Sequence, residues 1–208
     1  MIRIFTDWPE PLISSISIII GAIVGGVFSW IITKKSTDKT IEVQNKMFED
    51  NRKYAEDIRI RRSREYANII RLDICTALFN SIRILKSIKN KFDIDVYPIP
   101  MDRDYSIDVA YLKSQFQLRE LSYIYQLYGI IEKLNKDTNK FRYFNEEDYN
   151  NVKMGCQMFL KKLYGDNLNN ILEFDIEKVS YEELYDNELI KAGYKEVLRE
   201  LDNICNTE

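Results

Sequence analysis

Histidine is absent from this chain, and cysteine, glycine and proline are scarce. Its 208 residues include three cysteines, seven glycines and four prolines. Without histidine, the chain cannot form a Ser-His-Asp or Cys-His catalytic centre, a histidine-ligated zinc site or a histidine pH switch. Cys75, Cys156 and Cys205 are far apart and form no CxxC pair, which argues against a thiolate zinc site or a thioredoxin-like centre.

Motifs for phosphate binding and catalysis are also missing from the sequence. It contains no Walker loop and no GxGxxG, GxSxG or HExxH pattern. Asp93-x-Asp95 and Asp102-x-Asp104 are close acid pairs in a predicted loop, and carboxylates suit Mg²⁺ or Ca²⁺. They lack the glycine and the glutamate of an EF-hand, however, and polar turns are the better interpretation. We expect no metal, no cofactor and no enzymatic activity.

The strongest positive signal is residues 12–33, a run of 22 residues without a charge. As a helix it would be about 33 Å long, which matches the hydrocarbon core of a bilayer. Trp8 and Trp30 lie near its ends and Lys34 and Lys35 follow it, as anchors at a membrane interface do. The run is long for a signal peptide, and no small-x-small cleavage site follows it. We predict a retained transmembrane helix rather than a signal peptide or a buried core helix.

Basic residues on the two sides of the span predict its orientation. Residues 1–11 contain a single basic side chain, whereas Lys34, Lys35, Lys39 and Lys46 follow the span. The first three of these lysines are placed to meet anionic lipid. The positive-inside rule places residues 1–11 outside and the C-terminal part in the cytoplasm, where unpaired cysteines stay reduced. The abundance of Ile, Asn and Lys is typical of an AT-rich bacterial or phage coding sequence. We expect a single-pass protein of the bacterial inner membrane.

Small residues recur every four positions within the span. Ser17, Gly21, Gly25 and Ser29 fall on one helix face, where they allow a second helix backbone to approach closely. Glycine is also common in membrane helices that do not pair. We hypothesise that the chain forms a homo-oligomer through this transmembrane packing face.

The remaining chain divides into two parts by its apolar pattern. In residues 34–65, Ile41, Phe48 and Ala55 are seven apart, but the heptad positions between them are polar, which favours a solvated helical stalk over a coiled coil. Residues 66–208 contain denser helical stripes. The stripes predict helices over residues 66–91, 106–135, 146–164 and 180–204. The expected fold is all-α, with a span, a stalk and an antiparallel cytoplasmic bundle of about four helices.

For three features of this cytoplasmic part the sequence makes specific predictions. Residues 168–179 fit either a short helix or an extended segment. Ser180-Tyr-Glu-Glu183 is a capping box, followed by a helix that is interrupted near Asp186. Tyrosines accompany the second stripe, and we expect them at the edge of the core with their hydroxyls in solvent, rather than as a stacking platform for bases or cofactors. These tyrosines are Tyr111, Tyr125 and Tyr128.

Charge is unevenly distributed along the chain. Residues 34–91 hold 15 basic and 8 acidic side chains, and residues 171–208 hold 4 basic and 11 acidic ones. The acidic last helix is therefore expected near the basic first one, in this subunit or in a neighbour. The densest basic cluster consists of Arg59, Arg61, Arg62 and Arg64. This cluster is a candidate patch for a protein partner. A solvated face or a set of internal ion pairs is the simpler interpretation. The acidic residues on both sides of the cluster argue against binding to nucleic acid.

The layout loosely resembles uncharacterised single-pass bacterial membrane proteins with a cytoplasmic helical domain, some of which accompany prophages and phage-defence loci. The resemblance is one of architecture, carried by the span that ends in Trp30–Lys35, the long polar helix and the segment Leu121–Tyr128. The first functional hypothesis is a membrane-anchored interaction or scaffold protein that self-associates through its span and binds a protein partner. The alternative is a membrane-perturbing effector or toxin, of phage-defence or superinfection-exclusion type, that acts by oligomerisation of the span.

Overall fold

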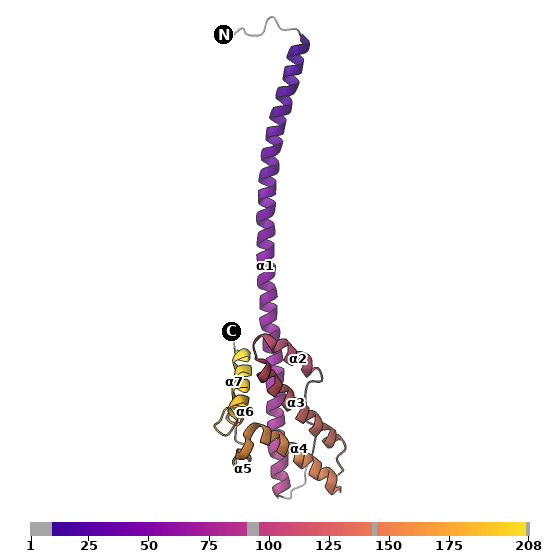
Figure 1. The fold of residues 1–208 in the computed structure, drawn as a ribbon, viewed down its shortest axis with the longest axis vertical. Helices are drawn as coiled ribbons and strands as arrows, with labels where there is room; N and C mark the ends of the chain where they lie inside the picture. The colour runs from indigo at the N-terminus through magenta and orange to yellow at the C-terminus, as the bar shows by residue number, and fades with distance from the viewer. Residues whose placement is uncertain (1–9, 91–95, 143–144, 207–208) are drawn as a thin grey trace. The chain divides into compact units, whose positions relative to one another are not determined.

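The computed structural model describes residues 10–90, 96–142 and 145–206, and every regular element in them is a helix (Figure 1). The expectation of an all-α protein is therefore confirmed. Trp8, most of the predicted tail and the Asp93–Asp95 pair lie outside the described residues. The elements are α1 (Glu10–Asn90), α2 (Tyr105–Tyr111), the 3₁₀ turn η1 (Leu112–Ser114), α3 (Leu118–Asn139), α4 (Glu146–Tyr164), the 3₁₀ turn η2 (Gly165–Asn167), α5 (Leu168–Ile171), α6 (Tyr181–Tyr185) and α7 (Ala192–Asn206).

Helix α1 is one uninterrupted helix of 81 residues. Such continuity is expected because the sequence has neither glycine nor proline between Gly26 and Pro98. The helix begins two residues before the predicted span, at Glu10. By its internal contacts the chain divides into two compact units, Met1–Ile58 and Arg59–Glu208.

In the first unit, large apolar side chains of α1 are exposed. Ile18, Phe28 and Trp30 are 69%, 63% and 64% exposed. Among the described residues, α1 is the one helix long and apolar enough to cross a membrane, and none of its most apolar window of 18 residues is buried. Apolar surface is unfavourable in water by about 25 cal/mol per Å². The N-terminal part of α1 therefore has an apolar surface that the first unit itself does not cover.

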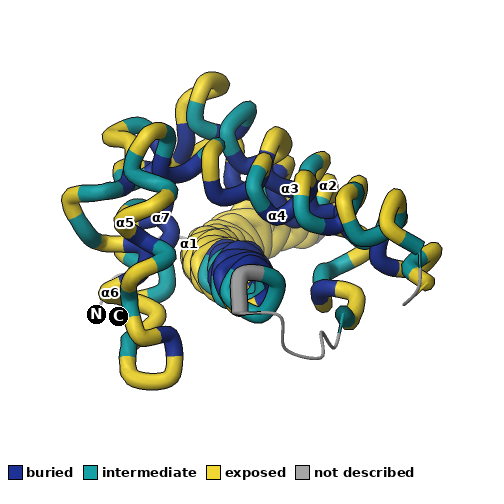
Figure 2. Tube along the Cα trace, turned by 90° about the horizontal axis from the view of Figure 1, so that it is seen from below, coloured by how far each residue is buried: buried dark blue, intermediate teal, exposed yellow. Residues whose placement is uncertain are grey.

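In the second unit, the C-terminal part of α1 shares one hydrophobic core with α3, α4 and α7 (Figure 2). The predicted stripe is buried at Ala67, Ile70, Ile74, Leu78, Ile82 and Leu85. Leu72, an apolar residue within the same stretch of α1, is 60% exposed. It lies about 200° around the helix from Ile70, and therefore points away from the core.

The second predicted helix, residues 106–135, is split in two. Helix α2 and η1 end at Ser114, and α3 begins at Leu118. Between them Phe116 is buried in the core, and Gln117 adopts an extended backbone. The Glu120 carboxylate accepts a hydrogen bond from the Gln117 backbone N–H at 2.6 Å, which caps the new helix. Burial of one aromatic ring thus overrides a helical pattern that has neither glycine nor proline at the break itself, between Leu112 and Leu118.

Helix α4 occupies the predicted residues, and local chemistry explains both of its ends. The Asn145 Oδ1 accepts a hydrogen bond from the Glu147 backbone N–H at 2.9 Å. At the other end, Gly165 has φ of 61°, a left-handed conformation that favours glycine. A methyl group on Gly155, in the middle of α4, would lie 2.8 Å from Leu134 Cδ1, so the glycine permits close packing of α4 on α3.

The C-terminal segment is more broken than a helix over residues 180–204. Ser180 and Glu183 form the predicted capping box, with backbone-to-side-chain hydrogen bonds of 3.2 and 2.9 Å. Helix α6 then ends after five residues, and the Asn187 amide donates to the Glu183 carbonyl at 2.6 Å. The predicted interruption is confirmed, and α7 follows it. Residues 168–179 form the short α5 and then turns.

Candidate functional surfaces

The small-residue face of the predicted span lies on the open surface of α1. Ser17, Gly21, Gly25 and Ser29 are all exposed. A methyl group placed on Gly21 or Gly25 would meet no described atom within 4 Å, apart from its own helix turn. Successive members of the row are offset by about 40° around the helix. This face therefore has the space to receive a second helix.

An aromatic ring and an ammonium group meet at the C-terminal end of the apolar segment. Lys34 Nζ lies 5.4 Å from the centroid of the Trp30 ring, within the range of a cation–π interaction. Both residues are exposed, as is Lys35. The four-residue spacing along α1 brings the ring and the ammonium group together. Trp8, the expected anchor at the other end, lies outside the described residues.

The four clustered arginines do not share one face of α1. At about 100° per residue, Arg59 and Arg62 lie on one side, and Arg61 and Arg64 lie roughly opposite. The first three are exposed and Arg64 is half-buried. Arg59 lines an open hollow of about 480 Å³ together with Lys113 and apolar side chains of α2. The cluster thus consists of two pairs, and its role in partner binding stays a prediction.

One ion pair and one hydrogen bond inside the second unit link the basic helix α1 to the acidic C-terminal segment. Arg71 of α1 pairs with Asp202 of α7, and the Lys86 ammonium donates to the backbone carbonyl of Phe174. The acidic C-terminal segment therefore packs against the basic helix of its own chain. This is one of the two arrangements that the charge distribution predicts.

A buried polar network connects α1, α3 and the segment before α2. Asp73 Oδ2 accepts hydrogen bonds from the Tyr128 hydroxyl at 2.9 Å and from the Asp102 backbone N–H at 2.8 Å. Tyr128 is fully buried and stacks on Tyr105, with ring centroids 4.2 Å apart. The expectation that its hydroxyl reaches solvent is wrong, because a carboxylate inside the core supplies its partner. Tyr125 has the expected exposed edge position, but its hydroxyl donates to the Ser106 carbonyl at 3.0 Å.

Asp108 of α2 is a second carboxylate of this region. It is 5% exposed, and its Oδ2 is buried with no hydrogen-bond partner among the described residues. Burial, followed by the negative charges of Asp102, Asp73, Asp104 and Glu65, raises the pKa of Asp108 to about 6. A carboxyl group with such a pKa can transfer protons when it lies beside a substrate site. A structural network of buried polar groups produces the same shift, so the pKa of Asp108 does not by itself identify a catalytic group.

The Asp102-x-Asp104 pair forms the polar turn that the sequence predicts. Asp102 Oδ1 accepts a hydrogen bond from the Asp104 backbone N–H at 2.6 Å. Within the residues that the structure describes, no three acidic or cysteine side chains are grouped closely enough to hold a metal ion. The local geometry of this pair is accounted for by the turn itself.

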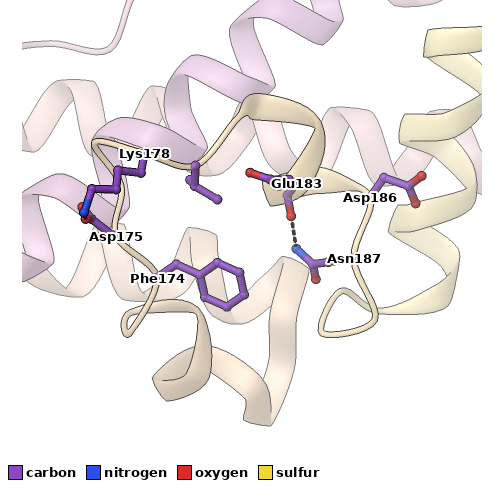
Figure 3. Close-up of a pocket in the computed structure, with 7 residues that line it drawn as sticks. Phe174, Asp175, Lys178, Glu183, Asp186 and Asn187 are labelled. Carbon is purple, nitrogen blue, oxygen red and sulfur yellow. Dashed lines mark hydrogen bonds and ion pairs between the residues drawn. The ribbon is translucent and has the colours of Figure 1, made fainter.

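An open hollow of about 460 Å³ lies beside α6 and the turns that precede it (Figure 3). Phe174 supplies an apolar wall. Two of the three acidic residues that line the hollow are in ion pairs, Asp175 with Lys178 at 3.0 Å and Asp186 with Arg199 at 2.8 Å. The third, Glu183, accepts the capping hydrogen bond from the Ser180 backbone N–H. The two ion pairs lower the pKa of Asp175 and of Asp186, so neither is suited to act as a general acid near neutral pH.

The cysteines have no feature of a reactive centre. Burial raises the pKa of Cys75 and of Cys156 to about 12, so both remain protonated thiols near neutral pH. Cys205 is half-buried, and burial again raises its pKa. A thiol becomes a strong nucleophile only as the thiolate, and none of these environments favours that form.

Comparison of the chain with protein-family models, with curated proteins and with solved structures finds no match. The resemblance to single-pass membrane proteins with a helical domain therefore remains an expectation. The features that bear on function are an apolar helix with an open small-residue face and a helical unit with its own core.

Sequence reasoning missed the Asp73–Tyr128 pair, although a signal for it was present. Asp73 lies between Leu72 and Ile74, inside a stripe of apolar residues. A carboxylate next to core positions requires a hydrogen-bond partner. The identity of that partner, 55 residues away, depends on how α3 packs and is not readable from spacing.

Proposed function

We propose that this chain is a single-pass membrane anchor that self-associates through its transmembrane helix and presents a helical protein-binding domain to the cytoplasm. In this proposal, residues 12–33 cross the inner membrane and residues 1–11 lie outside. Residues 34–65 are the stalk, and residues 66–208 act as an antiparallel bundle of about four helices. The partners are the lipid bilayer, a second copy of the chain and a protein, and no catalysis or cofactor is involved.

The observation that carries the proposal is the contrast in burial along α1. Residues of the span such as Ile18 and Phe28 are more than half exposed, whereas Ile70 and Ile74 are fully buried. The second unit thus buries the apolar stripe of its part of α1, whereas the apolar side chains of the span stay uncovered. A hydrocarbon environment removes that mismatch, because apolar side chains are favoured there and a continuous helix satisfies its own backbone.

Self-association is supported by the open small-residue face and is tested by filling it. Gly21→Leu with Gly25→Leu places two bulky side chains where a second backbone would approach. Chemical cross-linking of the full chain in native membranes should then fall severalfold. Ile19→Leu with Ile23→Leu, on the other side of the helix, is the matched control and should leave cross-linking unchanged. Equal cross-linking in all three proteins would contradict this part of the proposal.

The orientation is tested by thiol labelling in intact cells. A cysteine in place of Thr6 should react with a membrane-impermeant reagent from outside, in a background with Cys205→Ser. In the otherwise native chain, Cys205 should react only after the cells are opened. The reverse pattern would place the helical domain outside and contradict the positive-inside prediction.

The protein partner is sought at the hollow that Arg59 and Lys113 line. A photo-reactive residue in place of Lys113 should cross-link to a protein in cells, and Arg59→Glu with Arg62→Glu should abolish the product. A photo-reactive residue in place of the exposed Lys140 is the control position. A product that is insensitive to the charge reversal would separate partner binding from the basic cluster.

The serines in the span and its open face are also compatible with a second function, in which the assembled spans perturb the bilayer. A measurement of membrane potential discriminates between the two functions. A voltage-sensitive dye should show unchanged potential in bacteria that express the full chain as an anchor. Depolarisation by the full chain, but not by the Gly21→Leu/Gly25→Leu variant at equal membrane level, would favour the effector and place its action in span assembly.

A further inference from the structure

Charged and uncharged residues of the stalk lie on opposite halves of α1. Between residues 36 and 58 there are ten charged side chains, six acidic and four basic. At 3.6 residues per turn, all ten fall within an arc of about 160° around the helix axis. Every uncharged residue of this stretch except Asn45 falls in a second arc of about 160° on the other side. A helix that is solvated on all sides has no reason to show such a separation.

The uncharged half is open within the first unit. Its middle line, which we name the stalk seam, consists of Thr40, Gln44, Met47, Asn51, Tyr54 and Ile58. Met47 is 58% exposed and Tyr54 is 68% exposed, and Phe48 at the edge of the same half is 72% exposed. Exposed apolar side chains gathered along one helix side are typical of an interaction surface.

The stalk seam continues without a charge into the span, where it meets the small-residue face at Ser29. Along the same half of α1, Ser36, Thr33, Ser29 and Gly26 precede Thr40 at spacings of three or four residues. The intervening lysines, at positions 34 and 35, fall on the charged half at about 100° per residue. One side of a single helix therefore runs from the span to Ile58 with small, polar or apolar residues only.

We propose that the stalk seam pairs with the stalk seam of a second copy of this chain, in parallel and in register. The inference rests on the proposed membrane anchoring and self-association and extends them beyond the bilayer. Two copies that are inserted in one orientation present identical positions to each other at the same height. Met47, Tyr54 and Ile58 would then bury against their counterparts. Gln44 and Asn51 would meet as like pairs, and polar pairs inside a helix dimer fix its register.

The charge of the other half favours a protein occupant over a lipid surface. Helices that lie on membranes carry mainly basic residues on their polar side, because the headgroups are anionic. The charged half of the stalk has two more acids than bases. Its mixed signs also permit flanking pairs of opposite charge between two parallel helices, as at the flanking positions of coiled coils.

A cysteine scan of the full chain in native membranes tests the seam. Each variant carries one new cysteine in a Cys205→Ser background, and a mild oxidant is applied at pH 8. Cys75 and Cys156 are buried with pKa values of about 12 and do not compete. Disulfide-linked dimer should form severalfold more at the seam than at the charged half. The seam variants are Thr40→Cys, Met47→Cys, Asn51→Cys and Tyr54→Cys, and the matched variants are Glu42→Cys, Lys46→Cys, Glu49→Cys and Lys53→Cys.

Two charge variants with equal change in net charge provide a second readout. Met47→Lys with Tyr54→Lys should reduce the dimer formed by Asn51→Cys severalfold. Asn45→Lys with Glu49→Gln also adds two positive charges, but on the charged half, and should leave that dimer unchanged. Equal loss in both would attribute the effect to net charge and overturn the seam.

The remaining outcomes separate this inference from the function it rests on. Ser17→Cys and Ser29→Cys report on the span in the same oxidation series. Dimer at these positions with no periodic signal in the stalk would keep the span interface and overturn the seam. A periodic signal in the stalk without dimer in the span would keep the seam and overturn the span interface. Seam cysteines that form no dimer but are shielded from water-soluble reagents would assign this side to lipid, and would also overturn the proposal.

Discussion

The buried carboxyl of Asp108 makes the stability of the second unit depend on pH in a defined direction. Its pKa rises from an ordinary value of 3.8 to about 6 in the folded chain, first because of burial and then because its neighbours are acidic. The folded state therefore holds this proton more tightly than the unfolded chain does. Protonated Asp108 contributes its full stabilisation to the free energy of unfolding below about pH 4, and this stabilisation is lost as pH rises through about 6. Because asparagine carries no charge at any of these pH values, we predict that Asp108→Asn does not lose stability in this way.

The size of the effect follows from the shift in pKa. Each pKa unit corresponds to about 1.4 kcal/mol, so a shift of about two units corresponds to about 3 kcal/mol at neutral pH. Screening by water and counter-charges reduces such values, and we expect about 1–2 kcal/mol. An asparagine amide has the same shape and can donate toward the acidic neighbours, which adds no steric cost. Asp108→Asn should therefore be more stable than the native chain at pH 7 and nearly equal at pH 4.

The assay is urea unfolding of the full chain in non-ionic detergent, followed by far-ultraviolet circular dichroism between pH 4 and pH 7.5. The gap in unfolding free energy between variant and native chain should open between pH 4 and pH 6. Asp166→Asn, at an exposed position, is the matched control for removal of one carboxylate, and the gap of Asp108→Asn is read against it. A destabilised Asp108→Asn at every pH would refute the reasoning, because it would mean that the charged carboxylate has a partner and stabilises the fold.

Two further predictions concern packing and thiol reactivity. Gly155→Ala should destabilise the second unit by about 1–3 kcal/mol in the same unfolding assay, because the new methyl group collides with Leu134, and Leu134→Val should relieve part of the loss. In native membranes, Cys205 should react with a small thiol reagent at pH 8 while Cys75 and Cys156 stay unreacted until urea unfolds the chain; early reaction of either buried thiol would contradict the core assignment.

Local signals in the sequence predict where helices start and stop, and they succeed where the energetics are local. The Asn145 cap and the left-handed Gly165 delimit α4, and both are visible in the sequence. The Ser180 box starts α6 in the same way. A cap satisfies backbone groups with a side chain a few residues away, so it requires no knowledge of the tertiary structure.

Features that depend on packing between elements could not be predicted, because their energetics are not local. The break between α2 and α3 arises because Phe116 enters the core, and the helical pattern of residues 106–135 contains no residue that would forbid continuation. The Asp73–Tyr128 hydrogen bond joins positions 55 residues apart. Propensity and periodicity describe one element at a time, whereas both features are set by what a neighbouring element buries.

The proposed stalk seam shows how the choice of pattern decides what a sequence indicates. A strict heptad through Ile41 and Phe48 finds polar residues at every second core position, and so favours a solvated stalk. The seam from Gly26 to Ile58 instead advances about 3.56 residues per step, between the 3.5 of a supercoil and the 3.6 of a straight helix. Two nearly straight helices can keep such a line in contact with only a shallow left-handed supercoil. The position of the charges, rather than the count of apolar residues, therefore defines the surface, because a charge at the interface costs more free energy than a missing methyl group.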